Sequence, residues 1–319
     1  MVRRLVLLFA ALLLAPAILA QGYPNRPIKV VVPWPPGGGT DAVTRMVTQK
    51  MSALLGQPIV IDNRAGAGGS IGLEFGAKAP ADGYTLVVAT SGAAINQTLA
   101  KNLPFNVLKD FDPIVVMAFN QGVLVVKPAL PVATVQEYIA YAKARPGVLT
   151  YGSNGQGSAT HLWTELFQMK TGVQLVHVPY KGAAPALNDL LGGQIDSLFI
   201  DMAVAIPQIK AGKLKALGVG SPARFEALPE VPTISESGVP GYEARSFTGL
   251  LAPAGTPKDA IRILQSAAVK VLADPEVRQG LFALAAVPVG DSSEYFAQLL
   301  RKEVDQWGVV IGAAKIEAQ

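Results

Sequence analysis

The stretch VVPWPPGGGTDAVTRM, from Val31 to Met46, joins a run of β-branched residues to a helical pattern. Its valines favour a strand, and the apolar spacing after Thr40 favours an amphipathic helix. Between them, adjacent prolines lead into three adjacent glycines. Glycine lets backbone N–H groups approach a bound group closely, and the positive end of the next helix favours an anion. The stretch therefore predicts a strand, loop and helix that can hold a small anion.

The same order of elements occurs a second time along the chain. The first copy predicts a strand at 28–32, a glycine loop at 37–39, a helix at about 40–55 and strands at 59–62 and 84–89. The second predicts a strand at 148–151, a glycine loop at 152–157, a helix at about 158–171 and strands at 174–178 and 197–200. Short apolar strands that alternate with helices predict two α/β lobes, each a mostly parallel sheet flanked by helices.

The length of 319 residues suits two domains. The apolar stretch 111–127 is expected to leave the first lobe, and 246–252 to return to it, so that two crossings form a hinge. The C-terminal helices, expected after Pro257 and Asp291, pack back on the first lobe in this prediction. We therefore expect lobe 1 to hold residues 21–122 and 247–319, and lobe 2 to hold residues 123–246.

The first twenty residues have the pattern of a secretory signal peptide. Arg3 and Arg4 precede an apolar run from Leu5 to Leu19, and Ala20 offers a small residue for cleavage. A membrane anchor is the alternative, but the run is shorter than the roughly 20 residues of a spanning helix. The chain has no cysteine, which excludes thiol catalysis, Cys-ligated zinc and an N-terminal lipid anchor. We expect an exported protein that is not embedded in the membrane.

The charge balance does not favour a polyanionic partner. Without Arg3 and Arg4, 25 basic residues (27 minus 2) face 23 acidic ones, a formal charge of +2. So small a surplus indicates neither nucleic acid nor an anionic membrane as a partner.

Open parallel sheets bind ligands where their strands lead into helices, and both glycine loops lie there. Neither loop contains Lys or Arg, so a small anion would be held by backbone N–H groups and hydroxyls. The hydroxyl candidates are Thr40, Ser153, Ser158 and Thr160. Glycines after a strand also serve tight turns and helix packing, which is an equal explanation for one such loop. Two loops at equivalent places favour one shared cleft.

Other candidates follow later strands. Tyr180 follows the strand 174–178 and either faces the cleft or packs in the core. Asp201 follows the strand 197–200 and either accepts a hydrogen bond from a ligand amine or hydroxyl, or caps the next helix. Ser91 and Asn96 are the corresponding candidates in the first lobe.

Catalytic patterns are missing from the sequence. No G-x-S-x-G elbow occurs, and no serine is followed three places later by lysine. The two histidines do not have metal-binding spacing. His161 either touches the ligand or polarises the start of its helix, and His177 is expected in the core or at a strand edge. We therefore predict binding without catalytic residues, metal or cofactor.

A dinucleotide fingerprint is the formal alternative for the first loop. Gly37, Gly39 and Ala42 satisfy G-x-G-x-x-G/A, and Asp62 ends the next strand. The preceding prolines lengthen the approach, whereas the fingerprint needs a strand that leads directly into its first glycine. A nicotinamide cofactor is also not expected in an exported protein.

Six stretches, in order along nearly the whole mature chain, resemble the Bug family of periplasmic substrate-binding proteins of tripartite tricarboxylate transporters. They are YPNRPIKVVVPWPPGGGTD, VIDNRAGAGGSIG, APADGYTL, TYGSNGQGSATHL, VPYKG and LLAPAGTP. The resemblance implies a two-domain Venus-flytrap fold that closes on a small carboxylate, namely a dicarboxylate, an acidic amino acid or an aromatic acid. It also implies that both glycine loops hold the carboxylate, partly through ordered water. The matching positions run from Pro35 to Asp41 in the first loop and from Ser153 to Thr160, with His161, in the second. Within them, the expected ligand-binding residues are Pro36, Gly37, Gly38, Gly39, Thr40, Asp41, Ser153, Gly155, Gly157, Ser158, Ala159, Thr160 and His161.

One position departs from the family pattern. Phe247 stands in RSFTG where many relatives have Trp, which affects the expected wall of the pocket. The resemblance implies a monomer that delivers its ligand to membrane permease subunits. A periplasmic enzyme acting on the same acid, or a ligand-sensing subunit of a two-component system, remains the alternative.

Overall fold

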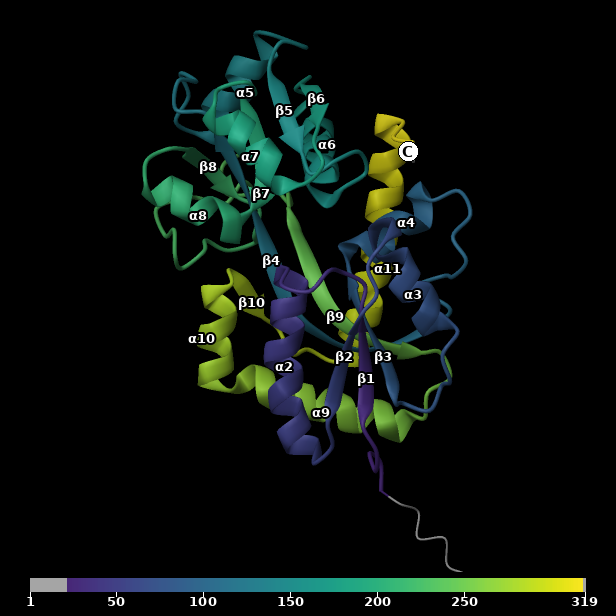
Figure 1. Cartoon of the computed structure of the whole chain (residues 1–319). Helices are drawn as coiled ribbons and strands as arrows, with labels where there is room; N and C mark the ends of the chain where they lie inside the picture. Colours follow the sequence, from purple (N-terminus) through teal and green to yellow (C-terminus); the bar gives the residue numbers. More distant parts are fainter. Residues whose placement is uncertain (1–21, 318–319) are drawn as a thin grey trace, which may run out of the picture.

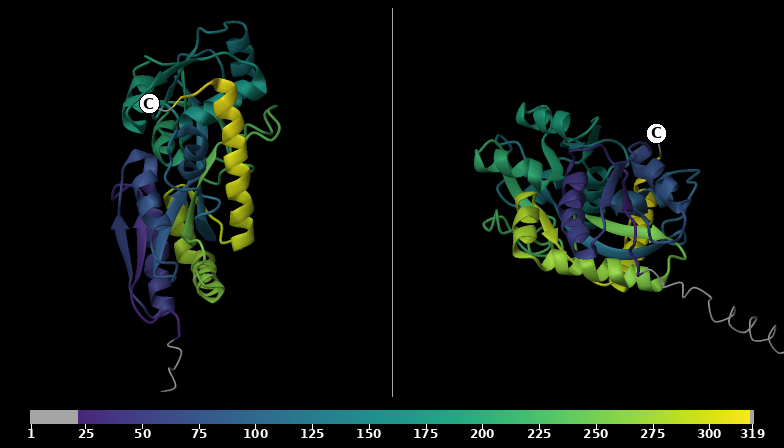
Figure 2. Two further views of the ribbon diagram at one scale, coloured as in Figure 1. Left: turned by 90° about the vertical axis from the view of Figure 1, so that its right-hand side faces the viewer. Right: turned by 60° about the horizontal axis from the view of Figure 1, so that its bottom comes forward.

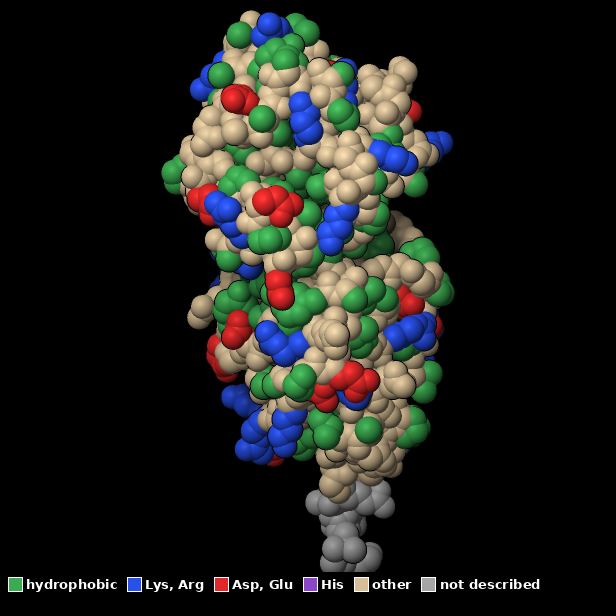
Figure 3. Space-filling model, turned by 90° about the vertical axis from the view of Figure 1, so that its left-hand side faces the viewer, with side chains coloured by type: hydrophobic (Ala, Val, Ile, Leu, Met, Phe, Trp, Pro, Cys, Tyr) green, Lys and Arg blue, Asp and Glu red, His purple; other side chains and the backbone are tan. Residues whose placement is uncertain are grey.

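The computed structural model describes residues 22–317 and has two lobes, one above the other in Figure 1. The predicted signal peptide lies outside the described residues. Within them, no helix combines the length and apolar character needed to cross a membrane. Acidic and basic side chains are interspersed over the face drawn in Figure 3, in keeping with the small net charge.

The first lobe is built on parallel strands. β1 (Ile28–Val32) lies between β2 (Ile59–Asn63) and β3 (Thr85–Thr90). Because strand side chains alternate between faces, Val30 and Val32 pack with α2 (Gly39–Leu55) and α9 (Lys258–Ala273) on one face. Val31 packs on the other face with α3 (Ser70–Ala77), which follows the short helix η1 (Ala67–Gly69). α4 (Ser91–Leu99) begins directly after β3.

The second lobe repeats this plan. β5 (Thr150–Ser153) lies between β6 (Val176–Pro179) and β7 (Ser197–Asp201), again in parallel. Its sheet packs on α5 (Val135–Lys143) and α6 (Ala159–Thr171) on one face. α7 (Ala183–Leu191) and α8 (Met202–Lys210) pack on the other. The sequence predicted this repeated strand and helix order.

One long strand, β4 (Phe111–Val126), runs through both lobes (Figure 1). Its first part pairs with β9 (Arg245–Pro253) in the first lobe, and its last residues pair with β7 and β8 (Lys215–Val219) in the second. These pairings are antiparallel, so the sheets are parallel only among β1, β2 and β3 and among β5, β6 and β7. At the crossing, Gly122 donates its N–H to the Ala244 carbonyl at 2.8 Å. A Cβ on Gly122 would lie 2.7 Å from that carbonyl oxygen, so only glycine fits there.

The C-terminal segment returns to the first lobe and then leaves it. α10 (Pro275–Ala283) follows α9, and β10 (Ala286–Pro288) pairs with β4. α11 (Ser293–Ala314) runs along both lobes (Figure 2). Its first half places Phe296 in a cluster of the first lobe, and its second half places Trp307 among residues of the second. The structure therefore extends the prediction that the C-terminal helices pack on the first lobe.

Candidate ligand-binding cleft

A cleft of about 630 Å³ lies between the lobes and is lined by residues of both. Four helices begin at it, because first-turn residues of α2, α4, α6 and α8 belong to its lining. The first N–H groups of a helix have no intrahelical acceptor and lie at the positive end of its dipole. Of the four N-cap residues, only Ser158 of α6 forms a side-chain cap, whereas Gly38, Thr90 and Asp201 form none. The cleft is therefore rich in backbone donors.

No Lys or Arg is among the described residues that line the cleft, so its anion preference comes from backbone dipoles. The sequence predicted two of the helix starts, those of α2 and α6, after the glycine loops. The contributions of α4 and α8 were anticipated only through individual candidates, Ser91 and Asn96 on α4 and Asp201 before α8.

Asp41 holds the first glycine loop in place through hydrogen bonds. This buried carboxylate accepts hydrogen bonds from the Gly37 N–H at 2.9 Å, from Arg45 Nε at 2.8 Å and from Asn63 Nδ2 at 2.9 Å. Burial alone would raise the pKa of Asp41, but these donors and the Arg45 charge hold it at about 2. Asn63 also donates to the carbonyl of Trp34, whose ring lines the cleft. Asp41 thus shapes the loop and does not line the cleft.

The second glycine loop is fixed by its own hydrogen bonds. The Asn154 N–H donates to Thr160 Oγ1 at 2.9 Å, and Ser158 Oγ donates to the Gly155 carbonyl at 2.7 Å. The Gly157 N–H donates to His161 Nδ1 at 3.0 Å. Gly157 has a φ of 71°, a conformation that favours glycine. The loop is therefore held in shape by the first turn of α6.

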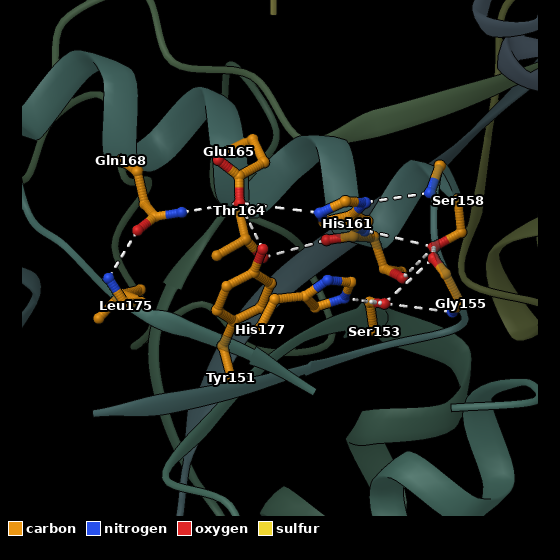
Figure 4. Close-up of polar contacts among 12 residues, drawn as sticks. Tyr151, Ser153, Gly155, Ser158, His161, Thr164, Glu165, Gln168, Leu175 and His177 are labelled. Carbon is orange, nitrogen blue, oxygen red and sulfur yellow. Dashed lines mark hydrogen bonds and ion pairs between the residues drawn. The ribbon is translucent and has the colours of Figure 1, made fainter. Parts of the chain in front are cut away.

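Two stacked imidazoles support this loop from behind (Figure 4). The rings of His161 and His177 lie 3.9 Å apart, and His177 stacks in turn on Tyr151 at 4.8 Å. Burial lowers the pKa of His161 to about 3, with a further contribution from His177. Burial also lowers the pKa of His177 to about 4. Both rings are therefore neutral at physiological pH and serve as packing and as a hydrogen-bond acceptor for the loop.

Ser153 and His177 form a pair that resembles a nucleophile and its base, with 2.7 Å between Ser153 Oγ and His177 Nε2. Ser153 is completely buried, however, and neither residue lines the cleft. The Ser153 hydroxyl is therefore not exposed to the cleft in this structure. Among residues 22–317, no group of three or more His, Asp or Glu side chains is placed to hold a metal ion.

The wall between the lobes was not anticipated from the sequence. Asn120 and Gln121 of β4 line the cleft at the point where the strand passes from one lobe to the other. Gln121 is only 3% exposed, and its Oε1 has no hydrogen-bond partner. Asn154 Oδ1 and the donor Trp163 Nε1 are also buried without a hydrogen-bond partner, and both residues line the cleft. The sequence did contain a signal for this wall, because two polar residues, Asn120 and Gln121, interrupt the long apolar run that forms β4.

The predicted site residues fall into two groups. Those that line the cleft are Gly39, Thr40, Asn96, Gly157, Ser158, Ala159, Thr160 and Asp201. Those that lie beside or behind it are Pro36, Gly37, Gly38, Asp41, Ser91, Ser153, Gly155, His161, Tyr180 and Phe247.

Two members of the second group lie away from the expected place. Phe247 was expected at the pocket wall, but it is fully buried against Phe296, 5.3 Å between ring centroids. Its neighbour Ser246 lines the cleft instead, because successive residues of a strand face opposite sides. Tyr180 donates its hydroxyl to Asp189 at 2.7 Å, which favours the packing alternative over a place in the cleft.

Comparison with known proteins is consistent with this geometry. The family model of the tripartite tricarboxylate transporter family receptor (TctC) matches residues 43–316. Protein BugT of Bordetella pertussis is 38% identical over 300 residues, which cover 93% of this chain and 92% of that protein.

Solved structures agree with the family match. An R. palustris protein with adipate is 36% identical, with a TM-score of 0.79, over 92% of this chain and 99% of that one. MatC from Rhodopseudomonas palustris with bound malate is 33% identical, with a TM-score of 0.75, over 91% of this chain and all of that one. These matches confirm the resemblance to the Bug family, and the chain belongs to the tripartite tricarboxylate transporter receptor (TctC) family of periplasmic solute-binding proteins.

Proposed function

We propose that the protein captures a small organic carboxylate between its lobes and delivers it to the membrane permease subunits of a tripartite tricarboxylate-type transporter. The observation that carries this proposal is the convergence of four helix N-termini on one cleft without a lining Lys or Arg. Each hydrogen bond to a charged group contributes about 1.5–3 kcal/mol, so a few N–H donors suffice for useful affinity. The relatives bound to adipate and malate support a carboxylate as the ligand.

The donors of the two lobes imply a mechanism of closure. A solute that first binds the α2 and α4 starts on one lobe gains contacts with α6 and α8 only when the other lobe approaches. Closure needs such contacts, because a ligand shifts a conformational equilibrium only by its different affinity for the two states. The closed form is then the form that membrane partners recognise.

Calorimetry on the mature protein tests the proposal. The protein is unfolded and refolded to remove copurified solute, and is titrated with adipate, malate, glutamate and benzoate, with adipamide as the uncharged control. We expect one-to-one binding of at least one acid, no binding of the amide, and recovery of the acid unchanged after incubation. Failure of every carboxylate to bind the refolded protein would overturn the proposal, and chemical conversion of the bound acid would favour the enzyme.

A variant at the start of α6 tests whether the N-terminus of this helix binds the charge of the ligand. Ala159 lies in the first turn of α6 and lines the cleft. Ala159→Asp adds a negative charge there, which suits the helix itself but repels an anion. We expect affinity to fall at least 100-fold with Ala159→Asp and much less with Ala159→Asn, which has nearly the same shape. Equal losses in the two variants would show that the charge of the ligand is not what α6 recognises.

A further inference from the structure

Asp201 ends β7 in the cleft and occupies the N-cap position of α8. The sequence left two roles for it, a cap for this helix or a contact with the ligand. Its side chain forms no cap hydrogen bond. Within residues 22–317 this side chain forms no hydrogen bond or salt bridge, and it is the sole ionisable side chain of the cleft lining. Its carboxylate therefore lines the cleft without a partner among the described residues.

This lack of a partner is unusual beside three other buried or half-buried carboxylates of the protein. Asp41 has three donors, as described above. Asp196 lies 2.7 Å from Lys127 Nζ and accepts a hydrogen bond from the Thr150 N–H at 2.8 Å. Glu165 accepts hydrogen bonds from Tyr151 and Gln168. Taking a carboxylate out of water without a donor is costly, so the half-buried and unpaired Asp201 indicates a donor that arrives with the ligand.

Two further acceptors lie in the same lining. Gln121 Oε1 and Asn154 Oδ1 are both buried without a donor. Gln121 precedes Gly122, which is the residue of β4 paired with Asp201 in the sheet. The lining thus offers N–H donors at its helix starts. It also offers unpaired oxygen acceptors, of which the Asp201 carboxylate is the charged one.

A cleft that has both N–H donors and a carboxylate acceptor suits a ligand that has both a negative and a positive group. We propose that the solute carries a protonated amine besides its carboxylate, and that Asp201 is the counter-ion of this ammonium group. The proposal rests on the proposed function, because the helix N-termini must hold the carboxylate. A plain dicarboxylate would bring a second negative charge into a cleft that already holds one, whereas an aminocarboxylate zwitterion satisfies donors and acceptors together.

Pairs of acids that differ by one amine test this inference. Glutamate is compared with glutarate, leucine with 4-methylpentanoate, and 6-aminohexanoate with hexanoate, by calorimetry at pH 7.5 on refolded protein. In at least one pair we expect the amine to increase affinity 10-fold or more. Asp201→Asn keeps the shape of the side chain and removes its charge. In this variant the advantage of the amine should fall below 3-fold, and the affinity for the acid without amine should not decrease, because the repulsion by Asp201 is removed.

Proton exchange gives a second readout, independent of the affinities. Burial raises the pKa of Asp201 to about 6. No other ionisable group among the described residues lines the cleft, so this proton is the one that binding moves. Titrations at pH 6, in two buffers of different ionisation enthalpy, should show release of up to about half a proton when an ammonium binds. Asp201→Asn should show none.

The outcomes separate the two proposals. If acids without an amine bind as tightly as their amino partners, or if Asp201→Asn leaves the advantage of the amine unchanged, the inference about Asp201 is overturned and carboxylate capture stands. Proton uptake at pH 6, as a second carboxylate would cause, also overturns it. If no acid of either kind binds the refolded protein, the proposed function fails and the inference fails with it.

Discussion

Asp201 shows how one residue can destabilise the fold that carries it. Burial raises its pKa from 3.8 to about 6 in the folded state. Well below pH 3.8 the carboxyl group is neutral in both states and costs nothing. As the pH rises from about 4 to about 6, the unfolded chain ionises before the folded one, so stability falls over this window and stays lower above it. A shift of about two pKa units corresponds to about 3 kcal/mol.

Asp201→Asn should therefore stabilise the protein in a pH-dependent way. We expect the difference in unfolding free energy between variant and wild type to be smallest near pH 4 and to increase by up to about 3 kcal/mol by pH 7. Urea unfolding at pH 4, 5, 6 and 7 measures it. Any constant effect of the amide cancels in the comparison across pH. A difference that stays flat from pH 4 to pH 7 would contradict the raised pKa.

At the scale of residues, the sequence predicted which residue types lie near the cleft better than where each side chain is directed. Asp41 and Thr40 are neighbours in the first turn of α2, yet only Thr40 lines the cleft, because Asn63 and Arg45 bind the Asp41 carboxylate on the other side. Ser246 and Phe247 face opposite sides of β9, and the pairing of β9 with β3 and β4 decides which of them lines the cleft. Such choices depend on partners far away in the sequence, which local patterns do not specify.

At the scale of elements, Gly157 meets α4 from the other lobe. A Cβ on Gly157 would lie 2.2 Å from Leu99 Cδ2, and the φ of 71° is strained for any other residue. Gly157→Ala therefore has two effects, loop strain of about 1–2 kcal/mol and contact with Leu99 as the lobes approach. We expect a lower unfolding free energy and a roughly tenfold lower ligand affinity, measured by urea unfolding and calorimetry.

The variant Leu99→Ala separates these effects. It removes the obstacle on α4 and leaves the strain of the loop. In Gly157→Ala combined with Leu99→Ala, compared with Leu99→Ala alone, affinity should return while the loss of stability remains. If affinity stays low in the double variant, the loop conformation and not the contact between the lobes controls binding.

The elements themselves were predictable where they are local. The helix expected at about 40–55 is α2 at 39–55, and the helix expected at about 158–171 is α6 at 159–171. Glycine loops and apolar periodicity fix such boundaries within the chain. The pairing of β4 with β7, β8, β9 and β10 was not predictable, because it joins segments up to about 170 residues apart. For that reason the Asn120 and Gln121 wall was also missed.

At the scale of the whole molecule, the lobes are joined by more than their crossing strands. α11 packs through Phe296 on the first lobe and through Trp307 on the second, and Ile95 of α4 belongs to the same cluster as Trp307. Trp307 also donates its Nε1–H to Glu303 at 2.7 Å within the helix. This side of the molecule is therefore fixed by a continuous apolar layer, and relative motion of the lobes must pivot near it.

Distances between spin labels can measure this motion, and the absence of native cysteine makes the labelling specific. Cysteines at the exposed residues Gln49 on α2 and Lys181 after β6 report on both lobes. With a saturating ligand, we expect a shorter and narrower distance distribution, because closure brings the starts of α6 and α8 to the solute. Labels at Gln49 and Lys270, both in the first lobe, should show no change. Identical distributions for the first pair with and without bound solute would mean that the protein binds without closing, and the proposed recognition by permease subunits would then need another signal.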